Sequence, residues 1–84
     1  MEYQVLFKAN ARKDLKALPE KDQYRVLAIL PLLASNPFVG KKLKGQHANE
    51  YAMKVWPYWV VYRIFKQIVT VVIVRIGHRK DVYT

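Results

Sequence analysis

Four side chains that could do chemistry are concentrated in one short stretch of the sequence. His78, Arg79, Lys80 and Tyr83 follow soon after an apolar run at residues 68–74. A neutral imidazole near pH 7 is suited to moving a proton, and the two cations beside it add positive charge. The same side chains could simply end a strand, with His78 and Arg79 bonding to backbone carbonyls and Tyr83 packing against a sheet. The stretch is therefore either a soluble tail or the working end of the molecule.

The net charge of +9 is concentrated in the second half of the chain. Residues 1–40 carry six basic and four acidic side chains, whereas residues 41–84 carry nine and two. Such a field attracts polyanions, above all nucleic acid, and an acidic protein is the competing partner. Lys41, Lys42 and Lys44 lie in a predicted basic loop at 41–50 that suits contacts with an RNA backbone. A plain solubility charge and a solvated loop are the alternatives.

Composition excludes several classes of protein. The chain of 84 residues has no cysteine, so it holds no disulfide scaffold and no thiolate metal site. His47 has no partner at metal-ligand spacing, so we expect no metal and no cofactor. The N-terminal segment at residues 1–7 is too short and too acidic for a signal peptide. The apolar run at residues 68–76 has about half the length that is needed to span a bilayer. We expect one cytoplasmic domain over residues 1–84 that does not enter a membrane.

The hydrophobic pattern predicts an α+β fold. Residues 2–7 alternate as a first strand, and Asn10 could cap a helix that Pro19 stops. A second helix is expected over residues 20–34, kinked or ended early by Pro31. Three closely spaced strands then follow at residues 51–56, 58–65 and 68–76. The order predicts a two-helix hairpin on one face of an antiparallel sheet, with a three-stranded meander and a short C-terminal segment.

Alternation along residues 51–56 places one cation on the open face of that sheet. Met53 and Val55 would face the helices, so Ala52, Lys54 and Trp56 share the opposite face. Lys54 therefore points to solvent, where a surface lysine is common. On residues 58–65 the pattern leaves open which set of side chains faces the core.

The order of short motifs along nearly the whole chain resembles the RelE/ParE superfamily of toxins from toxin–antitoxin operons. The motifs are VLFKANARKDLKALP, NPF, KLKG, VVYRI and VVIVRIGHRKDVY, and the last is nearest to the RelE branch. The resemblance implies a small ribonuclease-like α+β fold and an acidic antitoxin that wraps the toxin. Members of the RelE branch cut mRNA in the ribosomal A site without metal and leave 2′,3′-cyclic phosphate ends, whereas members of the ParE branch inhibit DNA gyrase.

The resemblance also assigns roles to individual residues. Lys54 corresponds to a catalytic basic residue, Arg79 to a C-terminal arginine near the transition state, and Tyr83 to a terminal tyrosine that orients the substrate nucleotide. His78 is the neighbouring candidate for proton transfer. Contacts with mRNA and ribosomal RNA are expected from six further side chains: Lys41, Lys42, Lys44, Trp59, Arg63 and Lys80.

Two positions depart from the family pattern. Ala52 and Trp59 stand where the family commonly has cations that contact the scissile phosphate. Losing two cations from a charge-stabilised transition state slows a reaction by orders of magnitude, although Trp59 could stack on a base. An attenuated nuclease, a ParE-like gyrase inhibitor and an inactive binding module therefore remain alternatives. Restoring cations at both positions is expected to raise cleavage if the first is correct.

Overall fold

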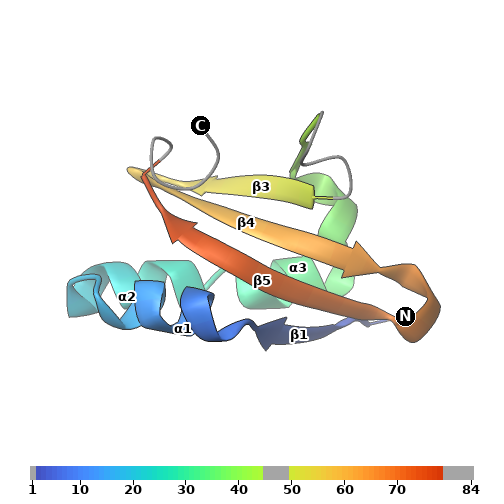
Figure 1. Ribbon diagram of the computed structural model, residues 1–84, viewed down its shortest axis with the longest axis horizontal. Coiled ribbons are helices and arrows are strands. Elements are labelled where there is room, and N and C mark those ends of the chain that lie inside the picture. Colours follow the sequence, from blue (N-terminus) through green and yellow to red (C-terminus); the bar gives the residue numbers. More distant parts are fainter. Residues whose placement is uncertain (1, 45–49, 79–84) are drawn as a thin grey trace.

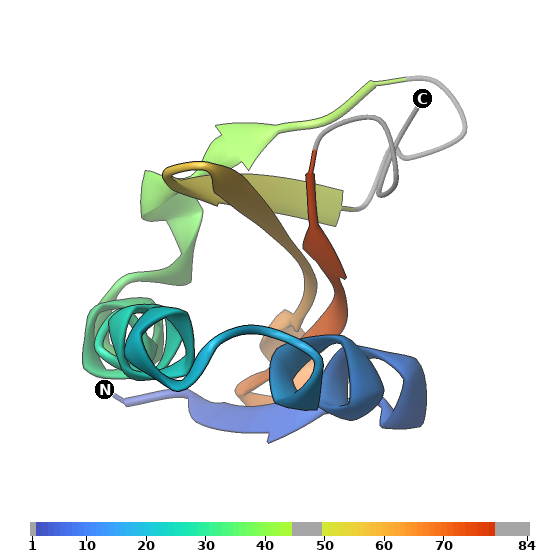
Figure 2. The same ribbon diagram turned by 90° about the vertical axis from the view of Figure 1, so that its left-hand side faces the viewer.

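The computed structural model describes residues 2–44 and 50–78 as a curved five-stranded sheet with helices packed on one face (Figures 1 and 2). Three helices follow the first strand, and they are α1 (Ala9–Lys16), α2 (Glu20–Leu27) and α3 (Leu30–Ser35). The strands are β1 (Gln4–Phe7), β2 (Lys41–Lys42), β3 (Glu50–Val55), β4 (Tyr58–Phe65) and β5 (Thr70–Gly77), and two 3-10 turns are η1 (Pro37–Val39) and η3 (Lys66–Ile68). In the part of the chain described, no helix is long and apolar enough to cross a membrane.

The sheet is mixed rather than antiparallel. Its strand order is β1-β5-β4-β3-β2, and β1 pairs with β5 in parallel, while every other neighbouring pair is antiparallel. The α+β class and the three-stranded meander are confirmed, but the prediction of a wholly antiparallel sheet is wrong. In the chain, the helices connect β1 to the remaining strands. This long connection allows β1 to lie parallel to its partner β5.

The helical region also differs in detail from its prediction. The segment predicted as one helix over residues 20–34 is two helices, because α2 ends at Leu27 and α3 begins at Leu30. Pro31 lies in the first turn of α3, where its missing N–H has no intrahelical partner to lose. Asn10 is not a cap, since α1 already begins at Ala9 and Lys8 is the capping position.

The turn between β4 and β5 moves the start of the last strand. Residues 66–68 form η3, and Val69 follows in the left-handed region with φ of 49°. Two hydrogen bonds hold this conformation, which is uncommon for a β-branched residue: Val69 N–H donates to the Lys66 carbonyl at 3.1 Å, and Thr70 Oγ1 donates to the Ile68 carbonyl at 2.8 Å. β5 therefore starts at Thr70, two residues later than the predicted strand.

The main core lies between the helices and the sheet. One residue from each helix is fully buried there, namely Ala11, Val26 and Leu33. They meet helix-facing side chains of the three long strands: Val55, Val60, Tyr62, Val71, Ile73 and Ile76. The helix-facing set of β4 is thus the one that begins with Tyr58, which the sequence pattern left open.

Among the described residues, Tyr62 is the largest fully buried side chain, and its hydroxyl group forms a hydrogen bond. The phenol donates a hydrogen bond to the carbonyl oxygen of Pro37 at 2.6 Å, linking β4 to η1. Burial is the main reason that the pKa of Tyr62 rises from 10.0 to about 12. The pKa of Tyr58 is also raised, mainly by a hydrogen bond to Asp22.

These two phenols predict a loss of stability at alkaline pH. The folded state holds its protons at a pH where the unfolded chain releases them, so this contribution is complete below about pH 10 and is lost as the pH rises towards 12. In a titration followed by tyrosinate absorbance, the signal should include a late step from Tyr62 as the pH approaches 12. Tyr62→Phe should remove the late step. A late step that persists in Tyr62→Phe, or that is absent from the parent protein, would contradict this assignment.

Candidate functional site

Lys54 lies on the sheet face opposite the helices, as predicted, and two indole rings flank its ammonium. It pairs directly across from Trp59 in the β3–β4 register. Its Nζ lies 4.8 Å from the ring centroid of Trp56 and 5.7 Å from that of Trp59. Both distances are within the range of cation–π attraction. Trp56 occupies the β3–β4 turn beside Pro57, so the hairpin end presents a cation and two flat aromatic surfaces together.

Ala52 shares that face but is covered. It is 1% exposed and belongs to a small second core with Leu43 and Val61, against which Trp59 and Val74 pack. The short strand β2 produces this cover because Lys41 pairs with Ala52 and the chain then turns Leu43 inward. Residues 41–50 are therefore not simply a loop. A side chain at position 52 would meet packed apolar groups before it met solvent.

The burial of Ala52 changes the effect that we expect from a cation introduced at position 52. Ala52→Lys should not raise activity but should lower the free energy of unfolding by about 1–3 kcal/mol, because the new side chain overfills the second core. Chemical denaturation of the two proteins measures this difference. A variant of unchanged stability and higher activity would show that Leu43 moves aside readily and that position 52 is open to a substrate.

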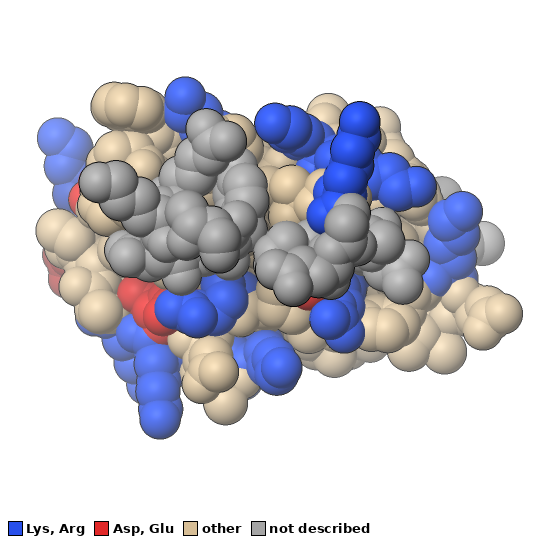
Figure 3. All heavy atoms as spheres, turned by 45° about the horizontal axis from the view of Figure 1, so that its top comes forward, with Lys and Arg blue, Asp and Glu red and all other residues tan. Residues whose placement is uncertain are grey.

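Basic side chains surround the open face. Lys41, Lys42 and Lys44 are exposed along the β2 edge, next to β3. In Figure 3, Lys and Arg side chains stand at many points of the visible surface, whereas acidic atoms show at only a few. Arg63 differs from these lysines because its Nε binds the Glu50 carboxylate at 2.9 Å, and its charge is thereby offset.

His78 lies elsewhere. Its ring contacts that of Tyr58 with centroids 5.3 Å apart, and the Tyr58 hydroxyl donates to Asp22 of α2 at 2.6 Å. Tyr58 belongs to the helix-facing side of β4, so Lys54 and His78 lie on opposite faces at this end of the sheet. The structure does not bring these two predicted residues together. Arg79, Lys80 and Tyr83 lie outside the described residues.

Two acidic residues of the helices position the strand ends near this site. Asp14 of α1 accepts hydrogen bonds from Arg75 Nε and from the Ile76 N–H, both at 2.9 Å. Asp22 holds the first residue of β4 and also pairs with Arg25 at 3.4 Å. This role of Asp22 could not be predicted from the sequence, because nothing local indicates a partner so far along the chain. Within residues 2–44 and 50–78, no three acidic or His side chains gather as metal ligands.

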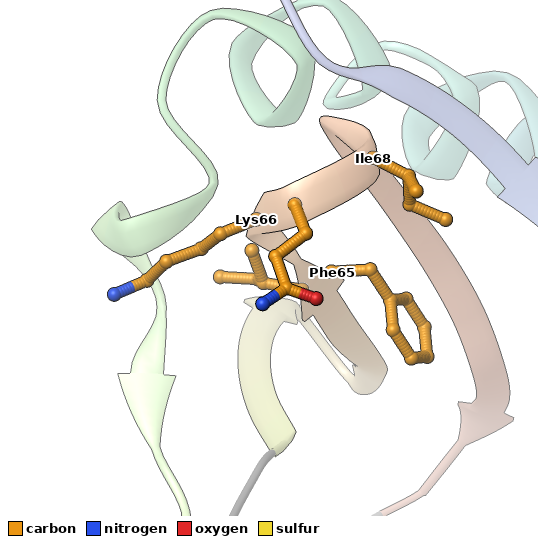
Figure 4. A pocket seen from close by; sticks show the side chains of 5 residues that line it. Phe65, Lys66 and Ile68 are labelled. Atoms are coloured by element: carbon orange, nitrogen blue, oxygen red, sulfur yellow. The ribbon is translucent and has the colours of Figure 1, made fainter.

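A hollow opens at the far end of the sheet. It has a volume of about 690 Å³ and is lined by Ile64, Phe65, Lys66, Gln67 and Ile68. Figure 4 shows Phe65 and Ile68 on one side of it, with Lys66 extending in another direction. The Lys66 ammonium lies 5.3 Å from the Phe38 ring centroid. The lining is mostly apolar and contains no acid or nucleophile, so the hollow is not a reaction site.

Comparisons with known proteins find relatives that match nearly the whole chain. A family model described as the ParE toxin of type II toxin–antitoxin systems matches residues 5–83. Toxin RelG of Mycobacterium tuberculosis is 36% identical and is matched over 99% of this chain and 98% of its own length. The structure of the RelBE2 toxin–antitoxin complex from the same organism superposes with a TM-score of 0.87 at 34% identity, covering 94% of this chain and 100% of that one.

A more distant structure, the archaeal RelE–RelB complex from Pyrococcus horikoshii, has the same fold. Its TM-score is 0.81 at 23% identity, with 96% of this chain and 99% of that chain covered. For Toxin RelG and the RelBE2 complex, the share of the chain that is covered and the sequence identity together show more than a shared fold. The chain belongs to the RelE/ParE superfamily of toxins of type II toxin–antitoxin systems.

Proposed function

We propose that this toxin is a ribosome-dependent endonuclease that cuts mRNA without a metal ion. The observation that carries the proposal is the position of Lys54, exposed on a positively charged sheet face between two aromatic rings. A cation at that point can bind the scissile phosphate, and the lysines of the β2 edge can hold the flanking RNA backbone. A ribosomal target implies action in the cytoplasm.

The reaction needs few groups. The ribose 2′-OH loses its proton and attacks the adjacent phosphorus, the bond to the 5′-oxygen breaks, and that oxygen takes up a proton. The products are a 2′,3′-cyclic phosphate and a 5′-hydroxyl. Lys54 stabilises the charge that develops on the phosphate oxygens. By the family resemblance, Arg79 and Tyr83 complete the site, while His78 would have to act from the other side of the sheet edge.

Programmed ribosomes test the proposal directly. Purified protein is added to ribosomes stalled on a defined mRNA, and the new RNA 5′ ends are mapped by primer extension. Cuts confined to the A-site codon, absent from naked mRNA, are the expected result. Ribosomes whose mRNA stays intact at high toxin concentration would rule out the nuclease.

Inhibition of DNA gyrase is the second candidate function. The family model that matches residues 5–83 is that of the ParE toxin, and an indole rather than a cation stands at Trp59. Supercoiling by gyrase, measured with the same protein preparation, separates the two candidates. Supercoiling inhibited at concentrations that leave mRNA intact would favour gyrase.

An acidic antitoxin is the proposed partner in either case. The two solved structures described above are toxin–antitoxin complexes, and the basic open face of this chain suits an acidic segment. Addition of the antitoxin should abolish whichever activity the toxin has.

A further inference from the structure

We propose that Trp56 and Trp59 form a stacking site for one nucleobase of a single-stranded RNA, with Lys54 held between them to receive the adjoining phosphate. This inference rests on the proposed action on RNA and adds to it how the substrate is held. It concerns the end of the β3–β4 hairpin, where all three side chains lie on or next to the open face.

Trp56 is the side chain that the rest of the fold explains least. It is 68% exposed, and it belongs to neither of the two hydrophobic clusters. Leaving a large indole in water forgoes the stabilisation that its burial would give. Among the residues that the structure describes, its one contact of the aromatic or polar kind is with Lys54, which is itself exposed. The ring therefore contributes little to the core, and its faces are accessible to a ligand.

Charge identifies the kind of ligand. Asp14 and Asp22 of the helices accept hydrogen bonds from side chains of β5 and β4. Glu50 on the open face is bound by Arg63. The lysines near the rings have no such acidic partner among the described residues, so the field at the hairpin end is positive. A ligand with negative charge at regular intervals and a flat ring beside each charge fits this surface. Single-stranded RNA has both features, whereas bases in a duplex are already stacked.

The lysine gives the site a way to couple base and phosphate. Before RNA binds, the ammonium is attracted to both indoles. A phosphate offers the same ammonium a stronger, charge-assisted hydrogen bond, so Lys54 moves towards the backbone and leaves the exposed Trp56 ring to a base. Every base has a π-face, and purines have the larger one. The site should therefore accept all four bases and prefer purines.

Intrinsic fluorescence reports this site because both tryptophans of the chain lie in it. A six-nucleotide oligoadenylate and a ribose–phosphate chain of equal length without bases are titrated into the full-length protein. The oligonucleotide should quench the emission, and the abasic chain should bind more weakly with little quenching. Equal quenching by the two would overturn the inference, since phosphate alone would then account for the signal.

Variants separate stacking from charge. Trp56→Ala should weaken oligoadenylate binding roughly 5- to 150-fold, while Trp56→Phe should retain most of the affinity. Tyr24→Ala is the matched control, because Tyr24 is also aromatic and is 66% exposed, but it lies on α2. Lys54→Ala should reduce the salt dependence of binding by about one phosphate contact, and Trp56→Ala should leave it unchanged.

Failure of this inference is distinguishable from failure of the proposed function. Unchanged affinity in Trp56→Ala, with ribosomal cleavage intact, overturns the stacking site and leaves the nuclease standing. Base-dependent quenching without cleavage supports the stacking site and removes the nuclease. Quenching by the acidic antitoxin but not by RNA would assign the two rings to a protein partner and overturn the inference.

Discussion

Lys54→Ala should cut mRNA on the ribosome about 100-fold more slowly than the parent protein, or slower still. The lysine is the cation placed between two indole rings at the hairpin end of the open face, and removing a group that stabilises transition-state charge typically has an effect of this size. The fold should survive, because Lys54 is exposed and takes no part in either hydrophobic cluster. Primer extension over a time course gives the rate, and thermal unfolding checks the fold.

Lys66→Ala is a closely matched control for this variant. Lys66 is also an exposed lysine whose ammonium lies over an aromatic ring, and its loss changes the net charge by the same amount. It lies at the opposite end of the sheet, beside the hollow at residues 64–68. Its removal should change the rate by less than about threefold, through the weaker overall field alone. Equal losses in the two variants would mean that total charge, and not the position of Lys54, governs the reaction.

Gly40→Ala should lower the free energy of unfolding by about 2–4 kcal/mol, a large effect for one methyl group. The φ of Gly40 is −73°, so its backbone conformation suits any residue. Space is the constraint. A Cβ on Gly40 would collide with the hydroxyl of Tyr62 and lie 3.0 Å from the carbonyl oxygen of Ala52. The phenol would have to leave its hydrogen bond to Pro37, in a region with no room to move.

Tyr62→Phe provides the test of that explanation. Phenylalanine removes the oxygen that the new methyl group would strike, so Gly40→Ala should be less damaging in this background. We expect a favourable coupling of at least about 1 kcal/mol between the two substitutions, measured by denaturant unfolding of all four proteins. Additive effects would show that the close approach to the Ala52 carbonyl, and not the hydroxyl, is what position 40 cannot relax.

Local patterns in the sequence were sufficient for the three long strands and for the exposure of Lys54. Strict alternation in residues 51–56 separates Met53 and Val55 from Lys54, and short turns require neighbouring strands to be antiparallel. The parallel pairing of β1 with β5 could not be derived in this way. It depends on how three helices return the chain to the sheet, and no residue in β1 encodes the direction of its partner.

The candidate site was only partly predictable for the same reason. Ala52 looked like a missing cation on an open face, because a two-residue strand such as β2 has no periodicity from which its cover could be inferred. The contact of His78 with Tyr58, and of Tyr58 with Asp22, joins three elements that are distant in sequence. Trp56 was assigned to a strand face, whereas its place in the turn is what exposes it.

The interior position of β5 in the sheet has a consequence for synthesis of the protein. This strand follows all the other described elements in the chain, yet it lies between β1 and β4, and its Ile76 amide reaches back 62 residues to Asp14. A nascent chain that lacks β5 has a first strand without a partner and helices without half of the sheet they cover. Folding must therefore wait for contacts of high sequence separation, which form slowly. A growing chain cannot present a finished toxin surface to the ribosome that is making it until β5 has left the exit tunnel.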